Sequence, residues 1–276
     1  MLTILQIYNA VEPGPLNTLH ILEYWMSVSF DVVIPFGPKD DDIIQRCVNS
    51  VLTHVVGVRY VFVIAHEKNT MDISNCIILK EESFPFKRAD VVEKTSEERA
   101  GWYIQQLIKF YAPLLVSNIT ENVLIVDADT VFYKRTRFIE NGKFLFDKVV
   151  APTHQPYFDH MKRLHPTFTV WKPLTSAITN TMIFNKKIVI ELMTKVEDFH
   201  KKDFWMAFLD CITEKTKSGA SEYEIYFNYM MNVKTDQTRV RPLQWNNNGQ
   251  RSIVQRGDWN YVSYPWYSQK PKNVFG

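Results

Sequence analysis

Buried-strand patterns alternate with helical patterns in the first third of the chain. Residues 31–38 form a short apolar run that ends in a Pro/Gly turn, and residues 59–65 form a second run without polar alternation. Between them, residues 43–52 carry apolar side chains at helical spacing after an acidic start, and residues 75–79 predict a third strand. This strand–helix–strand order predicts the first half of a Rossmann-like, mostly parallel α/β sheet.

The clearest helical pattern covers residues 96–116. Trp102, Gln106 and Lys109 share one face of this predicted helix, at spacings i, i+4 and i+7, opposite its apolar stripe. A solvated helix face rarely needs a tryptophan, so either another segment or a ligand is expected to cover this face. In the second case Gln106 and Lys109 would be hydrogen-bond donors to the ligand.

The second half of the chain is predicted to hold three helices, several short strands and two polar loops. Residues 154–165 hold three of the seven histidines among aromatic and polar side chains, which favours a binding loop. Residues 176–185 predict a strand, and residues 245–248 predict a polar aromatic loop. The predicted helices of this half are 187–199, 204–214 and 221–233.

The most informative stretch is an apolar run, residues 123–126, that leads directly into Asp127 and Asp129. In open α/β sheets, ligands bind at the carboxyl ends of the strands. Two carboxylates at such an end can hold Mg²⁺ or Mn²⁺ and leave positions for phosphate oxygens. Three interpretations remain open: the metal-binding motif of a nucleotide-sugar glycosyltransferase, the first motif of a haloacid-dehalogenase-type (HAD-like) phosphatase, or acids that only cap a turn.

Composition narrows the classes of partner. A net charge of +2 gives no electrostatic case for nucleic acid, and the missing Gly-x-Gly-x-x-Gly gives none for a dinucleotide cofactor. Aromatic residues make up 14% of the chain, which suits stacking on sugar rings but also a thick core. Cys47, Cys76 and Cys211 fit no metal or redox spacing. We expect buried free thiols and therefore a reducing, cytoplasmic compartment.

Residues 1–30 are predicted to be an extension packed on the main domain. They lack the basic start of a signal peptide, and no apolar run in the chain approaches the ~18 residues of a membrane span. A peripheral contact with a membrane surface is the alternative for this extension.

The motifs occur together, in one order, in a known type of protein. From residue 31 to about residue 266, the chain resembles a small GT-A-type glycosyltransferase family with poorly characterised members in bacteria and large DNA viruses. The residues that carry the resemblance are 31–40, 83–86, 101–109, 127–130, 156–161 and 218–228.

The resemblance implies one GT-A-like domain, residues 31–276, with a mostly parallel sheet flanked by helices. It implies a hexosyl- or pentosyltransferase that moves a sugar from a nucleotide-diphosphate donor, with a UDP-sugar favoured, to a hydroxyl of a glycan or glycoprotein. Mn²⁺ or Mg²⁺ would bridge the diphosphate, with Asp129 as direct ligand and Asp127 reaching the metal through water or holding the ribose. The alternatives are a HAD-like metal-dependent phosphatase and a nucleotide-sugar-binding protein without catalysis.

The candidate site residues fall into two groups. The donor side is expected to comprise strand ends and the polar face of helix 96–116: Pro35, Phe36, Gly37, Asp40, His66, Trp102, Gln106, Lys109 and Asp127. The acceptor side is expected to comprise the two polar loops and the strand between them: His154, Tyr157, His160, Asn180, Trp245 and Asn246.

Glu222 is the candidate catalytic base. Ser221 and Glu224 have the spacing of a capping box, which leaves Glu222 without an evident structural task. An inverting transferase needs a carboxylate that accepts the proton of the acceptor hydroxyl. The alternative is an ordinary first-turn acid favoured by the helix dipole.

Overall fold

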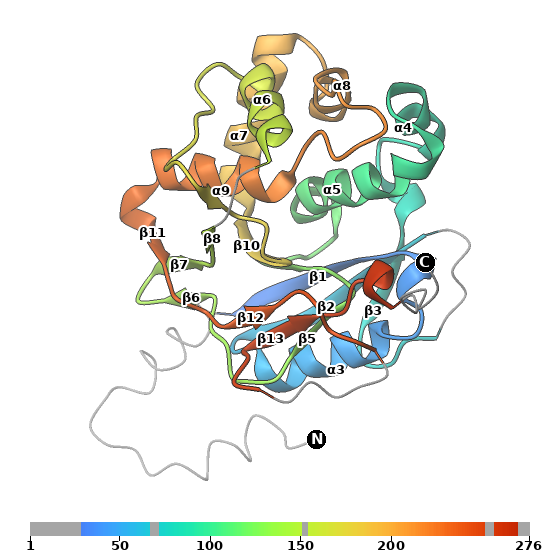
Figure 1. Ribbon diagram of the computed structural model, residues 1–276, viewed down its shortest axis with the longest axis vertical. Coiled ribbons are helices and arrows are strands. Elements are labelled where there is room, and N and C mark those ends of the chain that lie inside the picture. The colour runs from blue at the N-terminus through green and yellow to red at the C-terminus, as the bar shows by residue number, and fades with distance from the viewer. Residues whose placement is uncertain (1–28, 67–71, 151–153, 252–256, 270–276) are drawn as a thin grey trace, which may run out of the picture.

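A computed structural model describes residues 29–66, 72–150, 154–251 and 257–269. Its centre is a five-stranded sheet in the order β10–β4–β1–β2–β3 (Figure 1). Neighbouring strands from β4 to β3 are parallel, whereas β10 runs antiparallel to β4. The strands are β1 (Phe30–Phe36), β2 (Val58–Ala65), β3 (Ile77–Lys80), β4 (Asn122–Val126) and β10 (Thr181–Asn185). The predicted mixed α/β fold with a mostly parallel central sheet is confirmed.

Helices cover both faces of this sheet. α3 (Ile44–His54) lies below it in Figure 1, and α5 (Glu97–Leu115) lies above it with the other helices. The predicted long helix over residues 96–116 is therefore confirmed. The remaining helices are α4 (Arg88–Lys94), α6 (Gln155–Leu164), α7 (Lys186–His200), α8 (Phe204–Asp210) and α9 (Glu222–Val233).

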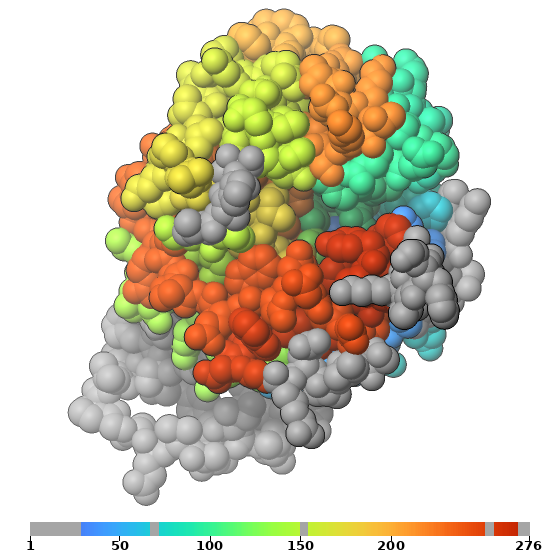
Figure 2. Space-filling model, in the orientation of Figure 1, coloured from blue at the N-terminus to red at the C-terminus, as the bar shows by residue number. Residues whose placement is uncertain are grey.

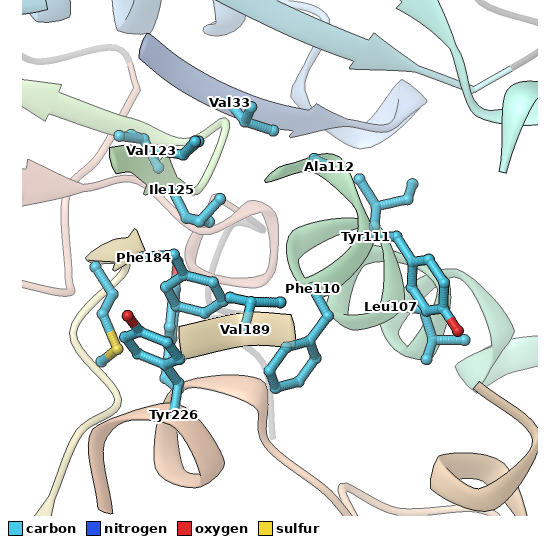
Figure 3. Packing of buried hydrophobic residues seen from close by; sticks show 14 of the residues in the cluster. Val33, Leu107, Phe110, Tyr111, Ala112, Val123, Ile125, Phe184, Val189 and Tyr226 are labelled. Carbon is cyan, nitrogen blue, oxygen red and sulfur yellow. The ribbon is translucent and has the colours of Figure 1, made fainter. Parts of the chain in front are cut away.

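The main core fills the space between the sheet and the upper helices (Figure 3). Val33 of β1 and Ile125 of β4 belong to one buried cluster with Phe110 of α5. Phe184 of β10 stacks on Tyr226 of α9, with ring centroids 4.0 Å apart and planes at 17°. This packing fixes α9 against β10, at one edge of the central sheet.

The start of β1 holds an ion pair between a buried carboxylate and a partly exposed arginine, which the sequence pattern did not indicate. Arg59 Nε and Nη2 donate to the Asp31 carboxylate at 2.9 and 2.6 Å. The backbone N–H groups of Tyr60 and Thr120 donate to the same carboxylate at 3.1 and 2.8 Å. Asp31 therefore fastens β1 to the start of β2 and to the segment before β4.

Short strands extend the fold after β4. β5 (Thr130–Phe132) pairs with β13 (Tyr261–Ser263), which pairs with β12 (Trp245–Asn246). In Figure 2 the C-terminal segment, orange to red, lies across the visible face between the upper helices and the lower part of the fold. The other short strands are β6 (Ile139–Glu140), β7 (Lys143–Phe146), β8 (Val149–Val150), β9 (Thr175–Ser176) and β11 (Thr238–Val240).

Two local predictions were wrong. The predicted binding loop over residues 154–165 is mostly helix α6, because Phe158, Met161 and Leu164 form a buried stripe at helical spacing. The predicted loop rested on the three histidines and not on the spacing of these apolar residues. Cys76 is only partly buried, whereas Cys47 and Cys211 are buried free thiols as expected.

The predicted N-terminal extension, residues 1–30, lies almost entirely outside the described residues. Its packing on the domain, and its alternative role at a membrane, therefore stay predictions. Within the ranges that the structure describes, no helix combines the length and the apolar character needed to cross a bilayer.

Candidate functional site

The carboxyl ends of β1 and β4 meet at one edge of the sheet because these strands are parallel neighbours. β1 leads through Gly37 into a short 3₁₀ helix, Pro38–Asp40, and β4 leads into Asp127. Burial raises the pKa of the Asp40 carboxyl, and the Asp127 charge adds to this, although the ion pair with Arg251 acts in the opposite direction. The strand ends expected on the donor side therefore do lie together.

A buried lysine joins two acids that are far apart in the sequence. Lys109 Nζ lies 2.5 Å from Asp127 Oδ1 and 2.6 Å from Glu222 Oε1. The ammonium also lies over the Tyr223 ring, 4.2 Å from its centroid. Burial by itself would lower the pKa of Lys109, but the two carboxylates outweigh it and hold the pKa above its ordinary value. Lys109 is therefore an ammonium group shared between two carboxylates.

The Asp127 carboxylate is held by two further donors. The Tyr223 hydroxyl donates to Oδ1 at 3.1 Å, and Asn180 Nδ2 donates to Oδ2 at 3.3 Å. The Asn180 carbonyl also accepts the Asp127 N–H at 2.9 Å. Asn180 was expected on the acceptor side, but it belongs to the surroundings of Asp127. The orientation of Asp127 is thus fixed from α5, α9 and the residue before β10.

Glu222 has a structural role that its sequence position did not indicate. Its backbone N–H donates to Gln106 Oε1 at 3.1 Å, and its carboxylate accepts from Lys109. Burial raises the pKa of the Glu222 carboxyl, although Lys109 acts in the opposite direction. At Gln106 and Lys109, the polar face of α5 is therefore covered by another segment, α9, which was one of the two alternatives.

Only half of the expected capping box is present. Ser221 Oγ accepts the Glu224 N–H at 3.3 Å, as the pattern predicts. The Glu224 carboxylate does not return to Ser221, because it accepts from Ser176 Oγ at 2.6 Å and from the Ala177 N–H at 3.2 Å. Glu224 therefore fixes the segment that leads to Asn180.

Asp129 lies in a more negative setting than Asp127. Ser263 Oγ donates to Asp129 Oδ1 at 2.9 Å, and the Tyr264 N–H donates to the Asp129 carbonyl at 2.9 Å. Burial, together with the Asp127 and Asp40 charges, raises the pKa of Asp129 to about 7. A bound cation would relieve this concentration of negative charge.

The donor set fits a divalent cation that arrives with a phosphate ligand. Asp127 and Asp129 offer hard oxygen ligands, which Mg²⁺ and Mn²⁺ prefer. Across the described ranges, no group of three or more His, Cys, Asp or Glu side chains could hold a metal. Mg²⁺ is usually held by one or two carboxylates together with phosphate oxygens and water. The two acids would therefore be sufficient protein ligands only if a phosphate group binds together with the metal.

A second cluster brings together expected donor-side and acceptor-side residues. Trp102 and Tyr157 stack with ring centroids 6.3 Å apart, and the Arg99 guanidinium lies 4.5 Å from the Trp102 centroid. Arg99 Nη2 donates to Ser218 Oγ at 2.5 Å, and His154 Nε2 lies 2.7 Å from the Ser218 carbonyl. Trp102 therefore contacts the acceptor-side candidate Tyr157, although it lies on the same helix as Lys109.

His160 does not lie at an acceptor surface. Its side chain is fully buried, with Nε2 2.8 Å from the Phe208 carbonyl and the two rings 4.7 Å apart. Burial lowers the pKa of His160 to about 3, so the ring is neutral near pH 7. The expectation for His160 is corrected because its side chain is in the core.

The other candidates make structural contacts of their own. Pro35 and Phe36 are buried in β1, so their side chains pack in the core, while the Phe36 carbonyl accepts the His66 N–H at 3.1 Å. Trp245 stacks on Tyr261 at a centroid distance of 5.7 Å. Asn246 Oδ1 accepts the Asn248 N–H at 3.0 Å, which shapes its own loop.

Sequence reasoning missed Tyr223, Ser263 and Arg251. Arg251 Nη2 donates to Asp40 Oδ1 at 2.6 Å, and its Nη1 donates to the Lys39 carbonyl at 2.8 Å. These contacts join the C-terminal segment to the end of β1. No local pattern marks such residues, because each acts through a partner more than 90 positions away.

Comparisons with known proteins add a family and a distant structural likeness. The apo form of mouse xyloside xylosyltransferase 1 is similar in structure, with a TM-score of 0.48 and 10% identity over 88% of this chain and 100% of that one. No curated protein matches the sequence significantly. The sequence pattern of the "Family of unknown function (DUF6492)" matches residues 40–270, which is well over half of the chain. The chain therefore belongs to the DUF6492 family.

Proposed function

We propose that this protein is a metal-dependent glycosyltransferase of the GT-A type. It would move a sugar from a nucleotide-diphosphate donor, with a UDP-sugar favoured, to a hydroxyl of a glycan or glycoprotein. The observation that supports this most strongly is the Asp127–Asp129 pair, at the carboxyl end of β4 and beside Asp40 at the end of β1. Open α/β sheets bind nucleotides at such an edge.

The two acids would have different roles. Asp129 is the proposed direct ligand of Mn²⁺ or Mg²⁺, because Ser263 donates to only one of its two oxygens among the described residues. Asp127 is already held by Lys109, Tyr223 and Asn180, so it would orient the donor from a fixed position. When bound, the metal would supply charge neutralisation for the leaving diphosphate.

Glu222 is the proposed base for an inverting transfer. Burial raises the pKa of its carboxyl, which favours proton acceptance, and Lys109 fixes its orientation. The proton of the acceptor hydroxyl would pass to a Glu222 oxygen as the new glycosidic bond forms and the bond between the sugar and the diphosphate breaks. A retaining transfer would need no such base.

The phosphatase alternative fits the site less well. A phosphatase that attacks with Asp127 would need one of its oxygens free to reach phosphorus. Lys109 and Tyr223 donate to Oδ1, and Asn180 donates to Oδ2. Oδ1 is therefore fully used, and attack by Oδ2 would require the loss of its contact with Asn180.

A panel of nucleotide sugars, with and without Mn²⁺, tests the proposed activity. Release of UDP or GDP from a nucleotide sugar supports a transferase, and hydrolysis of a simple phosphate ester supports the phosphatase. Binding without turnover supports a non-catalytic binding protein.

Calorimetry tests the metal site independently of turnover. Mn²⁺ is titrated in the presence of UDP into wild-type protein, Asp129→Asn and the control Asp258→Asn, whose carboxylate is 85% exposed and pairs with Lys134. We expect Mn²⁺ binding to be lost only in Asp129→Asn. Unchanged binding in that variant would contradict the metal assignment.

A further inference from the structure

Five residues form one hydrogen-bonded chain that includes Asp127 of the acidic pair. Gln106 contacts the Glu222 backbone, Glu222 and Asp127 share Lys109, and Asn180 contacts Asp127. At one end, Gln106 Nε2 is buried and has no partner among the described residues. At the other end, Asn180 Oδ1 is also buried and unpartnered within the same ranges. The chain thus ends in an unused donor on one side and an unused acceptor on the other.

The orientation of both amides is determined by their occupied partners. Gln106 must direct Oε1 at the Glu222 N–H, because an NH₂ group there would face another donor. Asn180 must direct Nδ2 at Asp127 Oδ2, because its oxygen there would face a carboxylate oxygen. The unpartnered atoms are therefore Gln106 Nε2 and Asn180 Oδ1, and exchanging O and N would not satisfy them.

Leaving such atoms buried has a cost. A buried polar group without a hydrogen-bond partner destabilises a fold. The rest of the cluster is well supplied with partners, since Glu222, Lys109 and Asp127 each make two or more hydrogen bonds to other residues. Gln106 is 2% exposed, so bulk water does not offset its missing hydrogen bond. Two orphans at the ends of one network point to a ligand that brings both an acceptor and a donor.

We propose that Gln106 and Asn180 recognise hydroxyl groups of the transferred sugar and that this sugar is neutral. A hydroxyl can accept from Gln106 Nε2, and another can donate to Asn180 Oδ1. This proposal rests on the proposed glycosyltransferase function, because it assigns the sugar-binding part of the same donor site.

The charges of the cluster select against an acidic sugar. Asp127, Asp129 and Glu222 supply three carboxyl groups, whereas Lys109 supplies the one cation in direct contact with two of them. With Mn²⁺ bound, the positive charges of the metal and Lys109 would already be shared among Asp127, Asp129, Glu222 and the diphosphate, so a carboxylate on the sugar ring would meet an excess of negative charge. A glucose-, galactose- or xylose-type ring meets no such repulsion.

The backbone at Asn180 supports a dedicated role for this side chain. Asn180 has φ +61°, a left-handed conformation that asparagine tolerates better than other residues with a side chain. That conformation allows its carbonyl to accept the Asp127 N–H while its amide contacts the Asp127 carboxylate. Glycine is the substitution that keeps the backbone and removes the amide.

The test compares dissociation constants for UDP alone and for UDP-sugars, by calorimetry with Mn²⁺. In Gln106→Met and Asn180→Gly, the Kd of UDP-glucose, UDP-galactose or UDP-xylose, whichever binds the wild type best, should rise about 3- to 10-fold. The Kd of UDP should rise less than the Kd of the UDP-sugar in each variant, because UDP lacks the sugar hydroxyls that the two amides are proposed to contact. Asn180→Gly also removes a donor to Asp127, so any general weakening of the site appears in both Kd values. Gln45→Met is the matched control on α3, where Gln45 contacts Asn49 and Ser74.

Each failure has a distinct meaning. If wild-type protein binds neither UDP nor any UDP-sugar, the proposed function fails and this inference fails with it. If UDP binds but both variants bind the UDP-sugar as well as the wild type does, the amide assignment alone is overturned. An equal rise in the Kd of UDP and of the UDP-sugar overturns that assignment as well, because it shows only a general weakening of the site.

A comparison of ligands on wild-type protein tests the charge preference without mutation. UDP-glucose and UDP-glucuronic acid differ by one carboxylate at the same ring. We expect the Kd of UDP-glucuronic acid to be about tenfold or more above that of UDP-glucose, since one further like charge nearby costs more than 1.4 kcal/mol. Equal or tighter binding of the acidic sugar would overturn the neutral-sugar assignment.

Discussion

The two ends of the central sheet each bury a carboxylate against a cation, but they satisfy it in different ways. At the amino end of β1, Asp31 receives two hydrogen bonds from Arg59 and two from backbone N–H groups. At the carboxyl end of β4, Asp127 and Glu222 share a single lysine, Lys109, and a third acid lies nearby.

This difference distinguishes a structural contact from a site whose charges and polar atoms are not all satisfied by the described residues. The Asp31 cluster balances one acid with one cation, and its donors match its acceptors. The Lys109 cluster has more acids than cations, and its hydrogen-bonded chain ends in two amide atoms that have no partner among the residues described. Excess charge and orphaned polar atoms destabilise a fold unless a ligand uses them. The carboxyl end is therefore the end where a ligand is expected.

The largest expected effect concerns Glu222, at the site end. In Glu222→Gln, we expect kcat to fall by about 10²–10⁴, because an amide cannot accept the acceptor's proton. The matched control on the same helix is Glu224→Gln, whose carboxylate contacts Ser176 and Ala177. That control should lower the melting temperature and leave the kcat of folded protein nearly unchanged. A Glu222→Gln enzyme with near-normal kcat would remove the base assignment.

The next effect concerns the amino end. Asp31→Ala removes the acceptor of the Tyr60 and Thr120 N–H groups, so we expect the free energy of unfolding to fall by about 1–3 kcal/mol. Urea unfolding measures this loss, and UDP affinity of the folded protein should not change. Asp258→Ala, which removes an exposed pair with Lys134, should cost at most about 1 kcal/mol. Loss of UDP binding in folded Asp31→Ala would show that the amino end also supports the ligand site, which would contradict the distinction between the two ends.

A double-mutant cycle sharpens the comparison at Lys109. Lys109→Met alone leaves the buried Glu222 carboxylate and the partly buried Asp127 carboxylate without their cation, and Glu222→Gln alone leaves Lys109 with one charged partner, Asp127. The combined variant should therefore be less destabilised than the sum of the single variants, with a coupling of about 0.5–3 kcal/mol. The exposed pair Arg88–Glu97 should give a coupling of at most about 1 kcal/mol in the same unfolding experiment. Equal couplings would mean that burial does not strengthen the Lys109 contacts.

The smallest effect concerns Tyr223. Tyr223→Phe removes the hydroxyl that donates to Asp127 but keeps the ring beneath Lys109. We expect a loss of about 0.5–1.5 kcal/mol in the free energy of unfolding. Tyr60→Phe, at an exposed ring, is the control and should change little. A much larger loss in Tyr223→Phe would show that Asp127 depends on this hydroxyl more than on Lys109.

Local patterns were sufficient for the elements that carry the site. Residues 123–126 form a buried strand because four consecutive apolar residues can be buried on both faces of a sheet. The helix over 97–115 follows from apolar spacing, and the acidic pair follows the strand end that its sequence predicts. These features depend on neighbours a few positions apart, so the sequence alone determines them.

The partners of these residues were decided by the tertiary structure. Lys109 and Glu222 are 113 positions apart, and Asp129 and Ser263 are 134 apart. Their contacts depend on how α5, α9 and β13 pack around the end of β4, which no local periodicity encodes. The same limit explains His160, whose polar character suggested a surface although its helix buries it. A sequence determines which face of an element is apolar, but packing decides which polar residues that face brings together.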